Sequence, residues 1–388
     1  LKVTHYDSIR EIPKKTWDAL FEERGTFNWN GLRLLEDSFV NNPEEFQNWN
    51  FTYIIIRDFD ENIVLATFLT QSISKDDMFS NSEVSREIEN KRKHDPMFMT
   101  SRTLSVGSPI TEGNHLYIDK NSALWKEAMS ILFDKISEVQ EREHITTTII
   151  RDLPNSDPEM DRLMVDNGYF KSSMPDNLKI KGLQSKNIDE FYAQLSKKNK
   201  GHYRRNIRRN IDQYELKLVN NCTYSDLKEI YQLYLNVKSK SLELNTFDLP
   251  IKLFEKISNS ENWEILSLYL KPNGQDIKKK SLAAIVLCHK GKKEFSGVIA
   301  GINYNYNRSH NCYRHMLFAI TRRAMELNYQ DIALGYTSTI EKKHFGAKVE
   351  NYCAYLQLKD NFNLEALETM STVKNREDGI NERRVLPI

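Results

Sequence analysis

Short apolar runs alternate along the chain with segments whose apolar residues recur at helical spacing, an order typical of a mixed α/β protein. In the first half, an amphipathic segment at 29–39 precedes two apolar runs, 51–56 and 63–69. The turn residues 58–62 join these two runs into a predicted hairpin. The further elements expected in this half are strands 103–106 and 116–118, helix 122–139, strand 145–150, helix 158–165 and strand 177–180.

The second half repeats this order. Its expected elements are a basic helix at 197–209, helices 225–242 and 251–257, strands 263–270, 282–288 and 294–302, helix 312–327, strand 331–334, a short helix before the glycine at 346, and strand 352–358. Each half therefore ends with a long helix, an aliphatic strand, a short helix, a glycine beside an aromatic residue, and a last strand. A duplicated α/β unit explains the repeat, and chance recurrence of βα order is the alternative.

Residues 72–93 interrupt the first half, because they are polar and charged and follow no strong period. The pattern predicts an inserted, partly helical excursion, and a role as a lid is left open. Met97, Phe98 and Met99 end this insertion, at about residue 100. We expect them to pack in the core rather than to touch a bilayer or an acyl chain.

Length and composition change the picture in three ways. The 388 residues exceed a single core, which stops growing near about 250–300 residues, so two domains are expected. A net charge of +1 gives no general nucleic-acid signature. The four cysteines lie far apart, without the spacing of a zinc site or a disulfide framework, so we expect buried thiols, a reducing compartment and no metal.

The chain start carries no apolar segment of a secretion signal, and no window approaches the roughly eighteen apolar residues of a spanning helix. We therefore expect a soluble cytoplasmic protein, and peripheral contact with the inner membrane face is left open.

The segment 197–209 is the strongest local anomaly. Tyr203, Ile207 and Ile211 recur every four positions, so one helix face can dock while the cations project outward. Guanidinium groups one turn apart suit phosphates, and a solvated helix face is the alternative. The cations, which no acid interrupts, are Lys197, Lys198, Lys200, Arg204, Arg205, Arg208 and Arg209.

Three stretches of the second half carry a resemblance: 195–209, Tyr313-Arg314-His315 at a predicted helix start, and 335–347. They resemble the GNAT-like N-acyltransferases with tandem domains, a group that includes the FemAB-like proteins and relatives labelled as peptidoglycan-biosynthesis or lipid N-acyltransferases. The resemblance implies an α/β fold of two tandem GNAT-like domains, with mixed central sheets flanked by helices. Residues 1–182 would form a degenerate domain and 183–388 the catalytic one.

The resemblance also implies a function, which is transfer of an acyl group from an acyl-CoA or acyl carrier protein thioester to a primary amine of a lipid or cell-envelope precursor. Acetyl-CoA users of the fold hold the pyrophosphate on a glycine-rich loop, whereas the corresponding passage at 307–311 has no glycine. Two alternatives stay open: a FemAB-like aminoacyl-tRNA-dependent transferase, although no paired heptad segments are present, and a non-catalytic protein that binds anions or nucleic acid.

Acyl transfer to an amine requires a proton acceptor, because a free alkylamine has a pKa near about 10.4. His315, in the first turn of its helix, is the first candidate for this base, and Glu294 is a second. Tyr313 and Tyr336 are expected to orient the substrate or to protonate the leaving group. Packing roles are the alternative for each of these side chains.

We expect the donor phosphates to bind the basic helix and the segment that follows strand 331–334. For His202, a place in the site and a place on its surface both stay open, and His344 lies just before the glycine turn at 346. The sequence predicts that Tyr313, His315 and Tyr336 share one cleft with the basic helix. The residues expected to bind the donor are Lys197, Arg204, Arg205, Arg208, Lys343 and Thr337.

Overall fold

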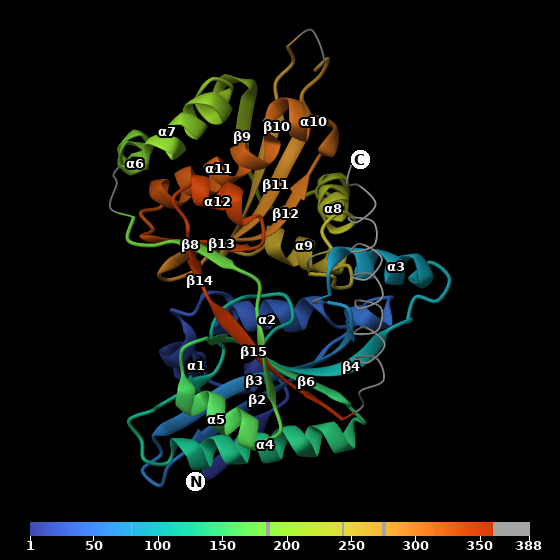
Figure 1. Ribbon diagram of the computed structural model, residues 1–388, viewed down its shortest axis with the longest axis vertical. Helices are drawn as coiled ribbons and strands as arrows, with labels where there is room; N and C mark the ends of the chain where they lie inside the picture. The colour runs from blue at the N-terminus through green and yellow to red at the C-terminus, as the bar shows by residue number, and fades with distance from the viewer. Residues whose placement is uncertain (79, 184–186, 243, 274–276, 360–388) are drawn as a thin grey trace, which may run out of the picture.

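The computed structural model describes residues 1–359 except 79, 184–186, 243 and 274–276, and it contains two mixed sheets with helices packed on them (Figure 1). The first sheet contains β1 (Lys2–Tyr6), β2 (Asn50–Arg57), β3 (Ile63–Lys75), β4 (Thr100–Val106), β5 (Tyr117–Ile118), β6 (Thr147–Pro154), β7 (Phe170–Ser173) and β15 (Tyr352–Leu358). The second contains β8 (Asn177–Ile180), β9 (Tyr214–Val219), β10 (Trp263–Leu270), β11 (Ser281–Lys290), β12 (Glu294–Ile302), β13 (Asp331–Tyr336) and β14 (Lys348–Glu350).

The helices surround both sheets. They are α1 (Lys14–Phe21), α2 (Trp29–Ser38), α3 (Ser82–Arg92), α4 (Trp125–Arg142), α5 (Pro158–Asp166), α6 (Ile188–Gln194), α7 (Lys197–Tyr203), α8 (Tyr224–Lys238), α9 (Ile251–Ser258), α10 (Tyr304–His310), α11 (Cys312–Glu326) and α12 (Thr339–His344). A π-helical turn, η4 (Arg204–Arg208), continues α7, and short 3₁₀ turns lie at Ile9–Glu11, Gly25–Phe27, Glu45–Gln47 and Ile211–Gln213.

Both halves have the same topology. Each sheet consists of antiparallel pairs except for one parallel pair, β4 with β6 in the first and β12 with β13 in the second. A long helix connects the parallel strands in each case, α4 in the first half and α11 in the second. The two-unit α/β architecture expected from the sequence is therefore confirmed.

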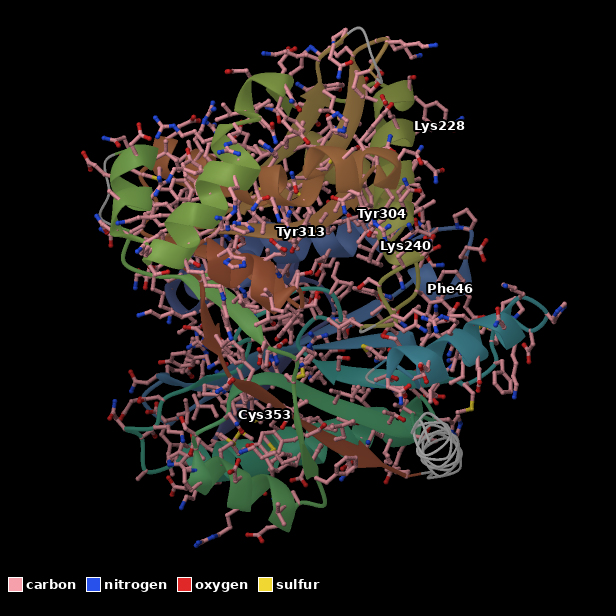
Figure 2. The ribbon with its side chains drawn as sticks, turned by 45° about the horizontal axis from the view of Figure 1, so that its top comes forward. Phe46, Lys228, Lys240, Tyr304, Tyr313 and Cys353 are labelled. Carbon is pink, nitrogen blue, oxygen red and sulfur yellow. The ribbon has the colours of Figure 1, made fainter. Side chains whose placement is uncertain are left out.

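The last strand of each half pairs with the sheet of the other half. β8 follows the first half but pairs with β13 and β14, with Ile180 opposite Ile332. β15 ends the second half but lies between β6 and β7, with Cys353 opposite Leu153, and Figure 2 shows Cys353 within the first half. The expectation that 177–180 and 352–358 each end their own half is corrected by this exchange. Strand register is set by long-range pairing, which local periodicity does not report.

Buried apolar residues fill the space between sheets and helices. α4 covers one face of the first sheet, with Met129, Leu132 and Ile136 in its core. α11 covers the second sheet from one side. A third cluster joins Trp17 and Phe68 of the first half to Phe254 of the second, so one core spans both halves.

The predicted insertion is confirmed as partly helical, since it contains α3. Its polar residues are anchored: Arg92 contacts Asp77 at 2.6 Å and Glu89 at 2.7 Å. Asn245, from the segment after α8, donates to both of these carboxylates at 2.8 Å. Lys75 completes the network with Glu89 at 2.7 Å. The hydrogen bonds of the buried Asn245 side chain therefore tie this charged network of the insertion to the second half.

The apolar end of the insertion packs inside only in part, because Met97 is 40% exposed, contrary to the expectation for it. Met99 joins Val84 and Ile88 of α3 in a small buried cluster, and Phe98 lies against it. None of the helices in the described part of the chain is both long and apolar enough to cross a bilayer.

Replacing Arg92 with leucine should destabilise the protein strongly, because the Asp77 carboxylate would stay buried without its partner; the two side chains are 4% and 0% exposed. We expect the free energy of unfolding in urea to fall by about 3–5 kcal/mol. Lys2→Met is the control, since the Lys2–Glu61 pair is 65% and 61% exposed and should contribute less than about 1 kcal/mol. Equal losses in both variants would contradict an anchoring role for the network.

Candidate functional site

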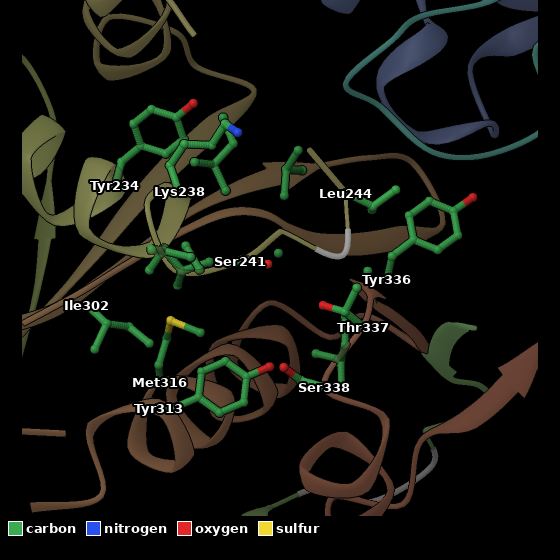
Figure 3. A pocket seen from close by; sticks show the side chains of 18 of the residues that line it. Tyr234, Lys238, Ser241, Leu244, Ile302, Tyr313, Met316, Tyr336, Thr337 and Ser338 are labelled. Carbon is green, nitrogen blue, oxygen red and sulfur yellow. The ribbon is translucent and has the colours of Figure 1, made fainter. Parts of the chain in front are cut away.

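The parallel strands β12 and β13 separate after a short pairing, and a cavity opens between them. Their ladder runs only from Glu294 opposite Asp331 to Ser296 opposite Ala333. Beyond it lies a cavity of about 710 Å³, between the splayed strands, α8, α10 and α11 (Figure 3). The first half contributes Met78, Pro109, Ile110, Glu112 and Arg151 to its wall.

β12 is irregular where it borders the cavity. Its pairing with β11 passes from Ile299 opposite Leu287 to Gly297 opposite Cys288, so Val298 is an extra, bulged residue. On the β13 side, residues 297–300 have no strand partner in the described ladders. Backbone N–H and C=O groups need hydrogen-bond partners. This edge of β12 is therefore able to bind a carbonyl group and to stabilise an oxyanion.

Glu112, from the loop between β4 and β5, reaches the point where the two halves exchange strands. Its Oε2 accepts a hydrogen bond from Nδ2 of Asn177 at 2.5 Å, and its Oε1 accepts from the backbone N–H of Tyr336 at 3.3 Å. Burial raises the pKa of the Glu112 carboxyl, and the Lys342 ammonium opposes that rise. A raised pKa brings a carboxyl group closer to proton exchange near neutrality.

Asp152 stands beside Glu112 and holds Tyr336. The Tyr336 hydroxyl donates a short hydrogen bond to Oδ1 of Asp152, and the Arg151 guanidinium donates to Oδ2 at 2.7 Å. Burial, followed by the negative charge of Asp152, raises the pKa of the Tyr336 phenol. Tyr336 thus stays protonated and directs its proton to Asp152.

Lys342 stabilises the end of β13. Its ammonium is buried and donates to the carbonyl oxygens of Gly335 at 2.9 Å and Tyr336 at 2.7 Å. Gly335 has φ +78°, and a Cβ atom on it would lie 2.9 Å from Oε1 of Glu112. Only glycine allows both this backbone conformation and the approach of the carboxylate.

Several residues without that freedom adopt left-handed backbone conformations around the cavity. Thr337 and Ser338 are consecutive, with φ +63° and +51°, and Asn311 has φ +55°. All three line the cavity. Asp152, beside them, has φ +59°. Such conformations are costly and concentrate at functional sites, so their clustering here supports a functional role for this cavity.

Tyr313 faces the cavity from the first turn of α11. Figure 3 shows its hydroxyl directed toward Ser338, with which it shares a hydrogen bond. Burial raises the pKa of Tyr313 to about 12. The expected placement of Tyr313, Tyr336 and Thr337 around one cleft agrees with the structure, since all three line it.

His315 does not line this cavity, contrary to the expected grouping. Two residues along an α-helix turn by about 200°, so Tyr313 and His315 point in opposite directions. The His315 ring is 1% exposed and stacks on Tyr214 of β9 at 4.1 Å. Burial lowers its pKa to about 4, which keeps the ring neutral. It packs beneath the basic helix instead of facing a substrate.

The basic helix lies outside the cavity, alongside α11 and α12. Its residues Lys197, Arg204, Arg205 and Arg208 are exposed, and none lines the cavity. His202, which belongs to this helix, stacks on His344 with 4.0 Å between the ring centroids and approaches Glu341 at 3.4 Å. Glu341 and its partner Arg314 line the cavity, so the basic helix borders this wall without entering the site.

Glu294 and Lys343 also lie away from the cavity. Glu294 forms an ion pair with Lys179 at 2.7 Å at the start of β12, before the strands separate. Lys343 is exposed, and its backbone carbonyl accepts hydrogen bonds from Nδ2 of Asn199 at 3.1 Å and from the backbone N–H of Gly346 at 3.0 Å. The neighbouring Lys342 faces the cavity in its place.

Sequence reasoning missed Glu112, Asp152 and Lys342. One signal was available: Arg151-Asp152 places two charges within the otherwise apolar run of β6. Glu112 carries no comparable signal, because a glutamate in a loop is ordinary until the fold brings it to the other half.

The segment between β12 and α11 differs from a phosphate-binding loop. α10 occupies it, and the backbone N–H of Tyr313 at the start of α11 already donates to Oδ1 of Asn307 at 3.1 Å. This amide of the helix start is thus taken by the protein itself. Within the described residues, no group of three His, Cys, Asp or Glu side chains is arranged to hold a metal ion.

No family model and no curated protein matches this sequence. Among known structures, FemX shares the fold, with a TM-score of 0.58 and 12% identity over 95% of this chain and 99% of that chain. The C-terminal domain of a lysylphosphatidylglycerol synthetase from Agrobacterium fabrum shows a TM-score of 0.49 and 11% identity over 94% of this chain and 96% of that chain. The tandem-domain fold expected from the resemblance to GNAT-like and FemAB-like proteins is confirmed, as a fold, by the likeness to FemX.

His315 should make stability depend on pH. Its pKa is about 4 when folded and about 6.5 when unfolded, so between these values only the unfolded chain binds the proton. The contribution of His315 to the free energy of unfolding is therefore complete above pH 6.5 and is lost as the pH falls toward 4. His315→Leu should reduce this slope by up to about 1.4 kcal/mol per pH unit in urea titrations.

The remaining slope should come from other buried histidines, because His115, His202 and His289 also have pKa values lowered to about 4 by burial. An unchanged slope in His315→Leu would show that His315 takes up its proton in the folded protein, against the burial described above.

Proposed function

We propose that this protein is a transferase that moves an acyl group from an activated thioester or ester donor to a primary amine inside the cavity, with Glu112 accepting the amine proton. The observation that carries the proposal is the position of Glu112: a carboxyl group whose pKa burial raises, in the same cavity as the open edge of β12. An acid–base group and an oxyanion site are what amide formation requires.

The reaction balances with groups present in the cavity. The acceptor arrives as an ammonium ion, attracted by the Glu112 carboxylate, which takes its proton directly or through one water molecule. The amine nitrogen attacks the donor carbonyl, and backbone N–H groups of residues 297–300 stabilise the oxyanion. The C–N bond forms and the bond from the carbonyl carbon to sulfur or oxygen breaks. The Tyr313 hydroxyl protonates the leaving group, and the second proton that the nitrogen loses as the amide forms restores the Tyr313 hydroxyl.

The other polar residues position these groups. Asp152 fixes Tyr336, whose backbone N–H in turn donates to Glu112, so the two carboxyl groups are linked through one residue. Lys342 holds the carbonyl groups that end β13. The Arg151 guanidinium balances the charge of Asp152.

The donor class follows from the start of α11. There the backbone N–H of Tyr313 already donates to Oδ1 of Asn307. Donor phosphates therefore have their best partners elsewhere, on the exposed cations of the basic helix. In the described residues none of Lys197, Arg204, Arg205 and Arg208 has an ion-pair partner, which supports a donor attached to a larger anionic carrier such as an acyl carrier protein. Acyl-CoA and aminoacyl-tRNA are the other donors to be tested, and an acceptor amine in a lipid or cell-envelope precursor stays a prediction.

Glu112→Gln tests the proposed base. Purified protein is incubated with an acyl-CoA, an acylated carrier protein or an aminoacyl-tRNA and a panel of primary amines, and amide products are followed by mass spectrometry. We expect the variant to lower the rate of transfer by about 10²-fold or more, since the amide side chain cannot take the proton. The wild-type rate should rise with pH through a pKa above 4.5, the ordinary value for a glutamate, because only the ionised carboxylate is basic.

Glu294→Gln is the matched control, since Glu294 lies in the ion pair with Lys179 outside the cavity. It should retain transfer at close to the wild-type rate. Wild-type protein that consumes no donor with any amine, or Glu112→Gln protein as active as wild type, would contradict the proposal.

A triple variant tests the basic helix as the donor-binding surface. Replacing Arg204, Arg205 and Arg208 with alanine should raise KM for the carrier-bound donor about tenfold or more at low salt, with little change in kcat, because electrostatic attraction acts on association. The effect should shrink at high ionic strength. Arg322→Ala, on the exposed side of α11 and paired with Glu326, is the control. A lower kcat at unchanged KM would contradict this role.

A further inference from the structure

The cavity has a cation at the end away from β8, the strand through which the first half joins the second sheet. Lys238, the last residue of α8, lines the cavity and projects from the side opposite Tyr313 (Figure 3). Among the described residues, its ammonium group has neither an ion-pair nor a hydrogen-bond partner. Lys75, the nearby cation on β3, is held by Glu89 at 2.7 Å and by Asn245 at 3.3 Å.

The surroundings of Lys238 offer little to stabilise its charge. Met78, Tyr234 and Leu249 line the same cavity, and Tyr234 lies beside Lys238 in Figure 3. The Tyr234 hydroxyl already accepts a hydrogen bond from the backbone N–H of Leu249 at 2.9 Å. Burial, and then the charge of Lys75, lowers the pKa of Lys238 to about 8. An unpaired ammonium group in such a place is costly unless an anion accompanies it.

The charged groups that face Lys238 come from three elements. Lys75 and Asp77 belong to β3 and the turn after it, and Glu89 belongs to α3. Asp248, in the segment between α8 and α9, opposes the lowering. Three of these four groups are engaged in the buried network described above, so they are not free to pair with Lys238.

The two ends of the cavity therefore carry opposite charge. Glu112 and Asp152 mark the end at the strand crossing, near Tyr336. Lys238 marks the other end, and Arg308 of α10, an exposed residue without an ion-pair partner in the described chain, lines the same cavity. Figure 3 shows Tyr336 and Lys238 well apart across the cavity.

We propose that Lys238 binds an anionic group, a carboxylate or a phosphate, of the amine acceptor, so that the acceptor is a zwitterion with its amine at Glu112 and its acid at Lys238. This assignment rests on the proposed function for the amine end, and it narrows the acceptors to amines that also carry an acid. A charge-assisted hydrogen bond to an anion supplies the partner that Lys238 lacks among the residues that the structure describes.

Chemical labelling of the full-length protein tests the anion site directly. Acetic anhydride acylates neutral lysine amines, and peptide mass spectrometry gives the labelling rate of each lysine. The probes are inorganic phosphate and acetate, each compared with chloride at equal ionic strength. A bound anion that raises the pKa of Lys238 by one unit lowers its neutral fraction at pH 7 by about tenfold, so labelling of Lys238 should slow about tenfold.

Lys228 is the matched control, because it is exposed on the same helix, lies apart from Lys240 in Figure 2 and does not line the cavity. Its labelling should not respond to either anion. Protection of Lys238 by phosphate alone assigns a phosphate-bearing acceptor, and protection by acetate alone assigns a carboxylate-bearing one. No protection by either anion, or equal protection of Lys238 and Lys228, overturns the proposal.

The labelling requires no transfer, so it separates the two proposals. A protein that protects Lys238 but forms no amide would reject the proposed function and leave the anion site. An active protein with unprotected Lys238 would reject the anion site alone. In an active protein, Lys238→Met should raise KM for an acidic amine about tenfold more than for its uncharged amide analogue, and Lys238→Arg should restore the preference.

Discussion

The exchange of β8 and β15 between the two sheets is the constraint on which the site depends. Because each sheet needs a strand from the other half of the chain, the halves cannot separate without breaking strand ladders. The acidic end of the cavity lies where β8 crosses, since Asn177 begins that strand and donates to Glu112. A carboxyl group from one half is thereby held at the open strand edge of the other. That arrangement lets a duplicated fold build one site.

The cavity combines features that are costly separately and useful together. Three features each oppose folding: left-handed backbone at Thr337 and Ser338, a buried carboxyl at Glu112, and an ammonium at Lys238 that has no partner among the described residues. The shared apolar core and the network around Arg92 hold the walls against this cost. A ligand with complementary charges would relieve part of it, which connects the stability of the site to what the site binds.

Periodicity predicted most of the elements and the duplicated order, because the helices and buried strands carry clear apolar patterns. It did not predict the strand exchange, since pairing partners are long-range. Among the site residues, Tyr313, Tyr336 and Thr337 were placed correctly by their position at the end of a strand or the start of a helix. His315 was misplaced because the first turn of its helix was expected to face the cleft, although the helix turns His315 away from Tyr313. Lys343 was chosen on the resemblance, whereas the adjacent Lys342 lines the cavity. Glu112 depends on tertiary structure alone.

The raised pKa of the Glu112 carboxyl is the central claim, and this pKa is measurable without any substrate. Carbon NMR on protein labelled at the glutamate carboxyl carbon, assigned with Glu112→Gln, follows the titration of this group. The account predicts a pKa above 4.5, and a further rise in Lys342→Met, because the ammonium that opposes the effect of burial is gone. A Glu112 that titrates at or below 4.5, or that does not respond to the loss of Lys342, would contradict it.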